Sequence, residues 1–394
     1  MSYLDKLLAG RPVTWKPLGE VGKIYSGLSG KTKDDFKEGN AQFIPYTNIF
    51  NNLSVDTDDL SVVRISDSEK QNVVKYGDVL FTGSSETADE VGMSSVVTSA
   101  IERPLFLNSF CFGYRFNSDI YIIPGYCKHL FRGSFMRKAI IRAANGVTRH
   151  NISKTQFLMI PIPIPPRDVQ EEIVRVLDRF TELEAELETE LEAELEARQK
   201  QYAYYRDLLL TYPDDAVTYL PLGEVVDVRR GKRVVRKDLA EEGSYAVFQN
   251  SLTPLGYFDK WNVPKDSCFV VAAGAAGEIG YSRENFWAAD DIYYFESSGN
   301  LIDRYLYHFL LSSKHMITSK VRKASIPRLS RIALERLPIP IPPLEEQERI
   351  VGILDRLETL AHSISERLPR ELELRRKQYA YYRDLLLTFP PQDK

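Results

Sequence analysis

One feature constrains the fold of this chain more than any other, because long stretches of its sequence occur twice. The residues KQYAYYRDLLLT stand at 200–211 and again at 377–388, and PIPIPP stands at 161–166 and again at 338–343. Both pairs are separated by 177 residues (161 to 338 and 200 to 377), so the block between them is duplicated without an insertion. Chance does not produce such a match. The chain is a tandem duplication.

Shorter matches extend the repeat toward the start of each half. PLGEV stands at residues 17–21 and again at 221–225. The first residues of the chain also resemble the end of the repeated block. The matching residues are Tyr3, Asp5, Leu7 and Leu8 with Tyr205, Asp207, Leu209 and Leu210. We therefore expect the N-terminal segment to complete the C-terminal helical repeat, which would relate the two halves by a pseudo-two-fold, cyclic arrangement.

Between the repeated blocks lie two stretches of domain size whose sequences differ. Each contains apolar runs before glycine-rich turns, such as residues 77–81 and 267–271, which predict strands, and each ends in a helical stretch, 125–144 or 303–321. The predicted fold class is α+β, with two mixed α/β globular domains joined by two long antiparallel coiled-coil helices. The predicted segments are an N-terminal segment at 1–17, a globular domain at 18–160, a PIPIPP-plus-helix segment at 161–213, a globular domain at 214–337 and a PIPIPP-plus-helix segment at 338–394.

The segment after each PIPIPP predicts a long helix. Residues 181–196 place a glutamate at every even position, which is the period of a strand. In the second copy, however, the glutamates are replaced while apolar residues persist at three- and four-residue spacing, which is typical of a helix. A helix of about 43 residues would be roughly 64 Å long, and its apolar stripe favours an antiparallel helix pair. The predicted seam residues are Ile173, Leu177, Phe180, Leu183, Leu187, Leu191 and Leu195 in the first helix, and Ile350, Leu354, Leu357, Leu360, Ile364, Leu368 and Leu372 in the second.

Two features of these helices need separate interpretation. We interpret the glutamates as a solvated helix face, and the alternative is an acidic strip that docks a partner protein. Pro369 has no counterpart in the first copy, where Glu192 stands. Because proline in a helix interior costs about 3 kcal/mol, it predicts a kink or break near residues 365–369.

No catalytic or metal site is indicated by the sequence. The stretch 27–32, GLSGKT, lacks the first glycine of a phosphate-binding loop, and 274–280 has the wrong glycine spacing for a dinucleotide loop. The three cysteines lie far apart without a CxxC pair, and there is neither an NPPY-type methyltransferase loop nor an apolar run long enough to span a membrane. We expect a non-catalytic, cytoplasmic protein that binds no metal and no cofactor of its own.

Clusters of Lys and Arg recur near both ends of both globular domains. Because the formal net charge of the chain is −4, binding to nucleic acid would have to use such local patches. The candidate DNA-binding residues are Lys31, Lys33, Arg132, Arg137, Arg142 and Arg149 in the first domain, and Arg229, Arg230, Lys232, Arg233, Lys320, Arg322, Lys323 and Arg328 in the second. Any one of them alone would be an ordinary surface charge, and it is the recurrence that favours phosphate binding.

The whole arrangement resembles the specificity (S) subunit of type I restriction-modification enzymes. The features that carry the resemblance are the two PLGEV segments, PIPIPP leading into VQEEI at 169–173 and EQERI at 346–350, and the two KQYAYYRDLLL ends. The resemblance implies two target recognition domains, each recognising one half of an asymmetric bipartite site in double-stranded DNA. It also implies that the helices set the half-site spacing and dock two methyltransferase (M) subunits, which restriction (R) subunits join. Any cofactor would belong to these partners.

Two other classes of function compete with this interpretation. The first is a coiled-coil scaffold that binds only proteins, and the second is a self-sufficient DNA methyltransferase or nuclease. The missing catalytic loops disfavour the enzyme. The DNA sequence that would be recognised does not follow from the chain, because no general code links loop residues to bases.

Overall fold

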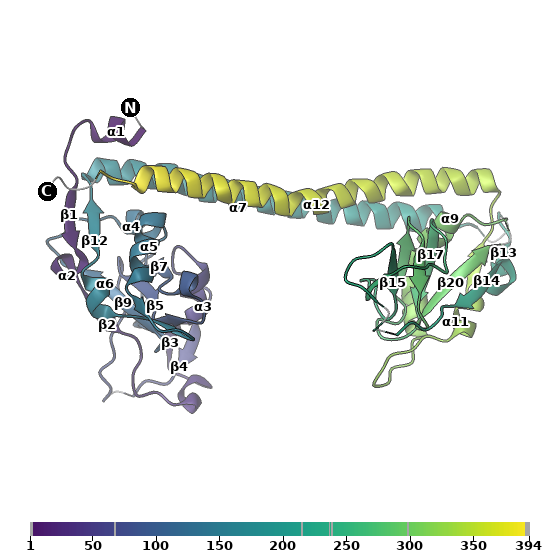
Figure 1. Ribbon diagram of the computed structural model, residues 1–394, viewed down its shortest axis with the longest axis horizontal. Coiled ribbons are helices and arrows are strands. Elements are labelled where there is room, and N and C mark those ends of the chain that lie inside the picture. Colours follow the sequence, from purple (N-terminus) through teal and green to yellow (C-terminus); the bar gives the residue numbers. More distant parts are fainter. Residues whose placement is uncertain are drawn as a thin grey trace. The chain divides into compact units, whose positions relative to one another are not determined.

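The computed structural model describes residues 3–66, 68–213, 216–235, 237, 239–297 and 299–390 (Figure 1). They form two compact units. Unit 1 combines the described residues up to Glu188 with those from Arg370 onward, and unit 2 spans Thr189–Pro369. Each unit therefore contains one globular domain and a part of both long helices.

Unit 1 is built on two main sheets and two small ones. The first is antiparallel, in the order β2 (Gly22–Ser26), β9 (Cys111–Phe116), β5 (Val79–Thr82) and β7 (Ser94–Val96). The second has the order β4 (Ser61–Val63), β3 (Ala41–Ile44) and β8 (Leu105–Leu107), with β3 antiparallel to β4 and parallel to β8. The small sheets are β10 (Ala144–Asn145), β11 (His150–Ile152) and β6 (Ser84–Ser85), and the pair β1 (Thr14–Pro17) with β12 (Pro161–Ile164).

Unit 2 repeats this topology with an unlike sequence. Its antiparallel sheet has the order β14 (Val226–Arg230), β20 (Ile292–Ser297), β17 (Ser267–Val271) and β18 (Ile279–Ser282). Its second sheet has the order β16 (Gly256–Phe258), β15 (Tyr245–Phe248) and β19 (Phe286–Ala288), again with one antiparallel and one parallel pairing. The pair β13 (Tyr219–Pro221) with β21 (Pro338–Pro340) corresponds to β1 with β12. The central strands β5 and β17 are buried along their whole length, as their continuous apolar sequences require.

Short helices cover these sheets. Those of unit 1 are α1 (Tyr3–Leu8), α2 (Leu18–Val21), α3 (Tyr46–Asn51), α4 (Pro124–Leu130), α5 (Ser134–Arg142) and α6 (Lys154–Leu158), with 3-10 turns η1 (Lys33–Phe36) and η2 (Ala88–Glu90). Those of unit 2 are α8 (Leu222–Val225), α9 (Asp303–Ser312), α10 (Lys314–Ser319) and α11 (Arg331–Glu335). The stretches expected as single helices at 125–144 and 303–321 are therefore each divided, in unit 1 at Gly133, whose backbone is extended.

The two long helices are α7 (Arg167–Leu209) and α12 (Leu344–Leu387), with 43 and 44 residues. The expected helix length is confirmed. The break expected at Pro369 is wrong, because α12 is continuous through it. Pro369 is exposed, so water can bind the carbonyl of Ser365 that loses its helical partner. The kink stays a prediction.

Seam residues near the globular domains are the most deeply buried. Ile173 and Leu177 belong to the core of unit 1, and Ile350 and Leu354 belong to the core of unit 2. Farther along the helices, Leu183 and Leu360 are 41% and 48% exposed. The first and last seam positions thus pack against the sheets' helices as well as along the helix pair. Within unit 1 the antiparallel pairing is direct, because the ring of Phe180 on α7 stacks on Tyr382 of α12 with 5.0 Å between centroids.

The described ends of the chain meet in unit 1. Trp15 of β1 donates from its indole nitrogen to the carbonyl of Pro390, at 3.1 Å. Helix α1 packs Leu4 and Leu8 into the unit 1 core, and Arg11 forms an ion pair with Asp168 at the start of α7. That residues 1–17 complete the C-terminal repeat stays a prediction. Among the described helices, none is long and apolar enough to cross a membrane.

Candidate DNA interface

In unit 2, several loops meet at one end of the main sheet. After β14, the amide of Gly231 donates to the carbonyl of Ile292 at the start of β20, at 2.9 Å. The amide of Ala272, after β17, donates to Asp291, and the amide of Leu329 donates to Ala272. The segments after β14 and β17, before β20 and before α11 are therefore neighbours. Lysines and arginines predicted from opposite ends of the domain converge there.

Unit 1 places the equivalent loops in the same way. The amide of Gly27, after β2, donates to Cys111 at the start of β9, at 3.2 Å. The amide of Gly83, after β5, donates to Phe110, and the amide of Ile152 donates to Gly83. We call this part of each unit its loop end. It comprises residues 27–30, 83–85, 108–110 and 145–151 in unit 1, and residues 231–235, 249–251, 273–277, 289–291 and 322–328 in unit 2.

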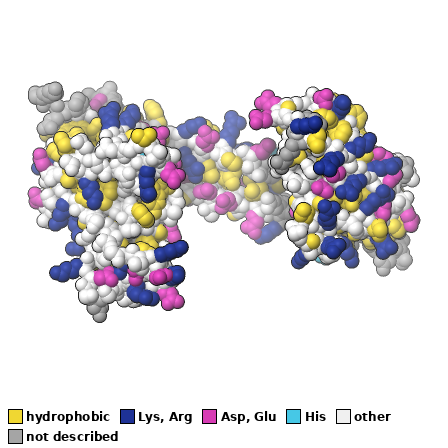
Figure 2. All heavy atoms as spheres, turned by 60° about the horizontal axis from the view of Figure 1, so that its bottom comes forward, with side chains coloured by type: hydrophobic (Ala, Val, Ile, Leu, Met, Phe, Trp, Pro, Cys, Tyr) yellow, Lys and Arg dark blue, Asp and Glu magenta, His cyan; other side chains and the backbone are white. Residues whose placement is uncertain are grey.

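Eight of the fourteen candidate cations are exposed, with neither an ion pair nor a side-chain hydrogen bond to any described residue. Such side chains are available to an external anion. Figure 2 shows Lys and Arg side chains gathered over the forward face of unit 2, at the right of the view. The eight residues are Lys33, Arg142, Lys232, Arg233, Lys320, Arg322, Lys323 and Arg328.

Three candidate cations are instead held inside unit 1. Arg132 donates to the backbone carbonyls of Ser94, Ile49, Phe50 and Asn52, and burial lowers its pKa to about 10. Lists of partners for the other two are similar in kind: Arg137 donates to the carbonyls of Asp89, Val91 and Gly92, and Lys31 contacts Glu69 and the carbonyl of Arg64. Burial also lowers the pKa of Arg137. These contacts order loops of the domain, so we leave the three residues out of the proposed interface.

The remaining three cations are exposed but already have partners. Arg229 pairs with Asp227 and Glu296, and Arg230 lies 3.7 Å from Asp291. Both arginines would have to exchange a carboxylate for a phosphate in order to bind DNA. Arg149 bonds the hydroxyl of Ser84 and lies over the exposed ring of Phe110, with 5.9 Å to the centroid.

Each unit also contains a buried histidine network that the sequence analysis missed. In unit 1, His129 of α4 bonds Asp178 of α7 at 2.6 Å and Tyr379 of α12 at 2.8 Å. Burial lowers the pKa of His129, whereas the pKa of Asp178 is lowered by hydrogen bonds from His129 and Lys128 against the opposing effect of burial. The network therefore ties the globular domain to both long helices.

Unit 2 contains the same network with the two helices exchanged. His308 of α9 bonds Asp355 of α12 at 2.9 Å and Tyr202 of α7 at 2.8 Å. Asp178 and Asp355 lie 177 residues apart, as do Tyr202 and Tyr379. Identity at this separation was the signal that could have found them, but the histidine partner lies in the divergent part of the sequence.

The repeated glutamine of VQEEI and EQERI has a similar structural role. The side-chain oxygen of Gln170 accepts from the amide of Ile123, and its nitrogen donates to Pro165, both at 2.9 Å. Gln347 does the same with Ile302 and Pro342. The motif thus fixes the PIPIPP segment and the start of α4 or α9 to the first turn of a long helix.

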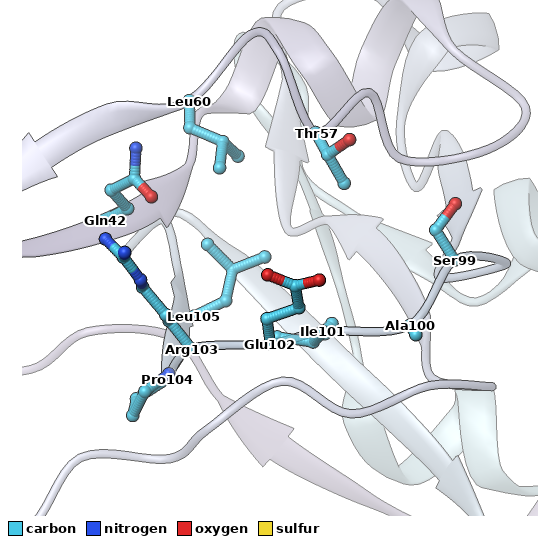
Figure 3. Close-up of a pocket in the computed structure, with 10 residues that line it drawn as sticks. All are labelled: Gln42, Thr57, Leu60, Ser99, Ala100, Ile101, Glu102, Arg103, Pro104 and Leu105. Carbon is cyan, nitrogen blue, oxygen red and sulfur yellow. The ribbon is translucent and has the colours of Figure 1, made fainter.

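Two other features do not form a functional site. His308, Asp355 and Glu358 lie close enough to hold a metal, but the guanidinium of Arg304 already bonds both carboxylates. The depression in Figure 3, of about 390 Å³, has Gln42 and Leu105 in its lining. These residues start β3 and β8, whereas the loop end lies beyond the other ends of these parallel strands.

Comparisons with known proteins agree with this structure. The profile of the type I restriction modification DNA specificity domain matches residues 12–197 and 215–374. A Haemophilus influenzae protein named as a type I restriction enzyme specificity subunit is 34% identical over 411 residues, which cover 98% of each chain. The specificity subunit of the Escherichia coli EcoR124I/EcoR124II enzyme is 29% identical over 99% of this chain and 98% of its own length.

Solved structures share the fold at low sequence identity. A chain from a structure titled for complex assembly and conformational transition of the type I R-M system gives a TM-score of 0.72 with 17% identity, covering 96% of this chain and 98% of that chain. The HsdS subunit from Thermoanaerobacter tengcongensis gives 0.59 with 16% identity, covering 96% and 97%.

The repeated frame with divergent loops thus defines a protein with two DNA target recognition domains in tandem. The chain belongs to the specificity-subunit family of type I restriction-modification systems. The family, the fold class and the tandem arrangement predicted from the sequence are confirmed.

Proposed function

We propose that this chain is the non-catalytic subunit that gives a type I restriction-modification complex its DNA sequence specificity. Each unit recognises one half of a bipartite site through its loop end. The observation that carries this proposal is the combination of one sheet topology, present twice, with unlike loops at the same end of both sheets. Because the loops differ, the two half-sites differ, and the complete site is asymmetric.

The long helices set the gap between the half-sites. Each has the length expected for a spacer of roughly 64 Å, which corresponds to no more than about two turns of duplex. Inserting or deleting residues within both helices should change the number of unspecified base pairs. An unchanged gap would contradict this role.

The repeated tyrosine segments dock the methyltransferase subunits. Tyr204 on α7 and Tyr381 on α12 are 64% and 65% exposed, and Leu208 and Leu385 beside them are also exposed. Internal packing does not require identical residues at exposed positions, whereas two copies of one partner do. The two matching patches therefore favour two M subunits, and R subunits join through the complex. Both the S-adenosylmethionine and the ATP chemistry of such a complex would belong to these partners in the cytoplasm.

The decisive experiment is to produce the chain together with its M subunit and to map N6-methyladenine across the host genome. An asymmetric two-part motif that disappears when this chain is omitted is expected. Replacing residues 18–160 by another such domain should then change one half-site only. An active M subunit that yields no chain-dependent motif would favour the protein-only scaffold, and methylation by the purified chain alone would favour the enzyme.

A further inference from the structure

Both loop ends carry a hairpin of the same length in the same place. In unit 2 the amide of Arg322 donates to the carbonyl of Arg328, and the amide of Arg328 donates back to Arg322. In unit 1, Asn145 on β10 pairs with Asn151 on β11. The separation is 177 residues at both ends of the hairpin, from 145 to 322 and from 151 to 328. We call residues 145–151 and 322–328 the tip hairpins. The second projects from unit 2 as a light-green loop in Figure 1.

Each tip hairpin is anchored to its unit in the same way. Asn151 pairs with Ser84 after β5, and Arg328 pairs with Ala273 after β17. Shortly after each hairpin a serine caps the next helix: the hydroxyls of Ser153 and Ser330 accept from backbone amides of α6 and α11. The frame around the hairpins is therefore duplicated.

The residues at the tips are not duplicated. Residues 146–150 read GVTRH and residues 323–327 read KASIP. In unit 1 the chain turns at Gly146, whose φ of +122° suits glycine. A duplicated support with unlike tips is expected where each hairpin recognises its own part of a target. A hairpin with only a structural role would have no need to diverge at its solvent-exposed tip.

The tips combine an exposed apolar side chain with cations. Val147 is 92% exposed, more than any other large hydrophobic residue described, and Ile326 is 54% exposed. Among the described residues, Arg322, Lys323 and Arg328 have no side-chain partner. A single exposed aliphatic residue is ordinary, but here both tips have one beside cations. Duplex DNA offers matching surfaces, since phosphates attract the cations while thymine methyl groups and base steps accept β-branched side chains.

The surroundings of the first tip hairpin also suit bases better than phosphates. Arg149 and Phe110 line a groove of about 450 Å³ together with Ser84 and Ser85. Glu90 also lines this groove, and a carboxylate repels phosphate but accepts hydrogen bonds from the amino groups of cytosine or adenine.

We propose that each tip hairpin enters a groove of the DNA duplex, with Val147 or Ile326 packed against the bases and the neighbouring cations on the flanking phosphates. This inference rests on the proposed function, because it assigns the base-contacting segment of each recognition domain. It predicts that a single tip residue affects specificity in one half-site and leaves the other unchanged.

The test uses Val147→Ser and Ile326→Ser, each in the full chain produced with its M subunit, followed by genome-wide mapping of N6-methyladenine. Each variant should relax or change one or two positions of its own half-site and lower methylation at the original sites about five-fold or more. The other half-site is the internal control. Ile326→Val, which keeps the branched shape, should preserve the motif, and Val62→Ser, at an exposed position of β4 in another sheet, should have no effect.

The outcomes separate this inference from the proposed function. A wild-type motif that depends on the chain, together with unaltered motifs and methylation levels in both tip variants, would overturn the hairpin assignment while the proposed function stands. Loss of methylation by Ile326→Ser with preserved binding of the M subunit would support it, since the exposed side chain is not needed for folding. A wild-type chain that confers no motif would overturn both.

Discussion

Neutralising Lys232 and Arg233 should weaken DNA binding far more than neutralising Arg229 and Arg230, although both double substitutions remove two positive charges. The reason lies in their partners. Arg229 and Arg230 already face Asp227, Glu296 and Asp291, whereas Lys232 and Arg233 are exposed and have no side-chain partner among the described residues. Arginine that is already paired releases fewer counterions on binding DNA.

The expected magnitude follows from counterion release. Each phosphate contact contributes about 0.9 to the slope of log affinity against log salt concentration, so Lys232→Gln with Arg233→Gln should reduce the slope by up to about 1.8. Between about 50 and 200 mM salt, the wild-type complex should then lose roughly 12-fold more affinity than this variant. The variant Arg229→Gln with Arg230→Gln should keep most of the wild-type slope.

Fluorescence anisotropy provides the assay, using the complex with its M subunit and a labelled duplex carrying the motif found by methylation mapping. Thermal unfolding of each variant checks that the fold is intact. Equal slopes for the wild type and both double variants would refute the reasoning, because they would place the loop after β14 outside the interface. A larger loss for Arg229 and Arg230 would show that their carboxylate partners are exchanged for phosphates.

Three further predictions concern stability. Arg132→Met should lower the free energy of unfolding of unit 1 by about 2–4 kcal/mol in urea titrations, because the carbonyls of Ile49, Phe50 and Ser94 lose a buried charged donor; an unchanged midpoint would show that water replaces the guanidinium. The pKa of His129 is lowered by burial, so the unfolded chain binds the proton more readily, and stability should fall as the pH drops below about 6.5. His129→Gln should flatten that dependence in pH-dependent thermal unfolding, and identical profiles would contradict the assignment. Pro369→Ala should stabilise α12 by up to about 3 kcal/mol in chemical denaturation, and a destabilised variant would indicate that the proline is needed for the helix geometry.

Much of the architecture could be predicted because the repeat is covalent information. Identical segments at one separation imply identical local structures, and the periodicity of Ile173, Leu177 and their counterparts predicts helices of the observed length. The same signal identified the family. Pro369 shows its limit, since a local penalty does not decide whether a long helix continues when the rest of its hydrogen bonds favour continuation.

Which charges are free was decided only by tertiary structure. Arg132 and Lys323 look alike in the sequence, yet the first donates to carbonyls of loops about 40 and 80 residues away, while the second lies exposed on a tip hairpin. The histidine networks have the same origin, since His129 meets Asp178 and Tyr379 only when both helices pack on one domain. Sequence pattern determines local conformation and repetition, because these depend on neighbouring residues. The availability of a side chain depends on the burial and hydrogen bonding imposed by distant segments, and only the folded chain brings these together.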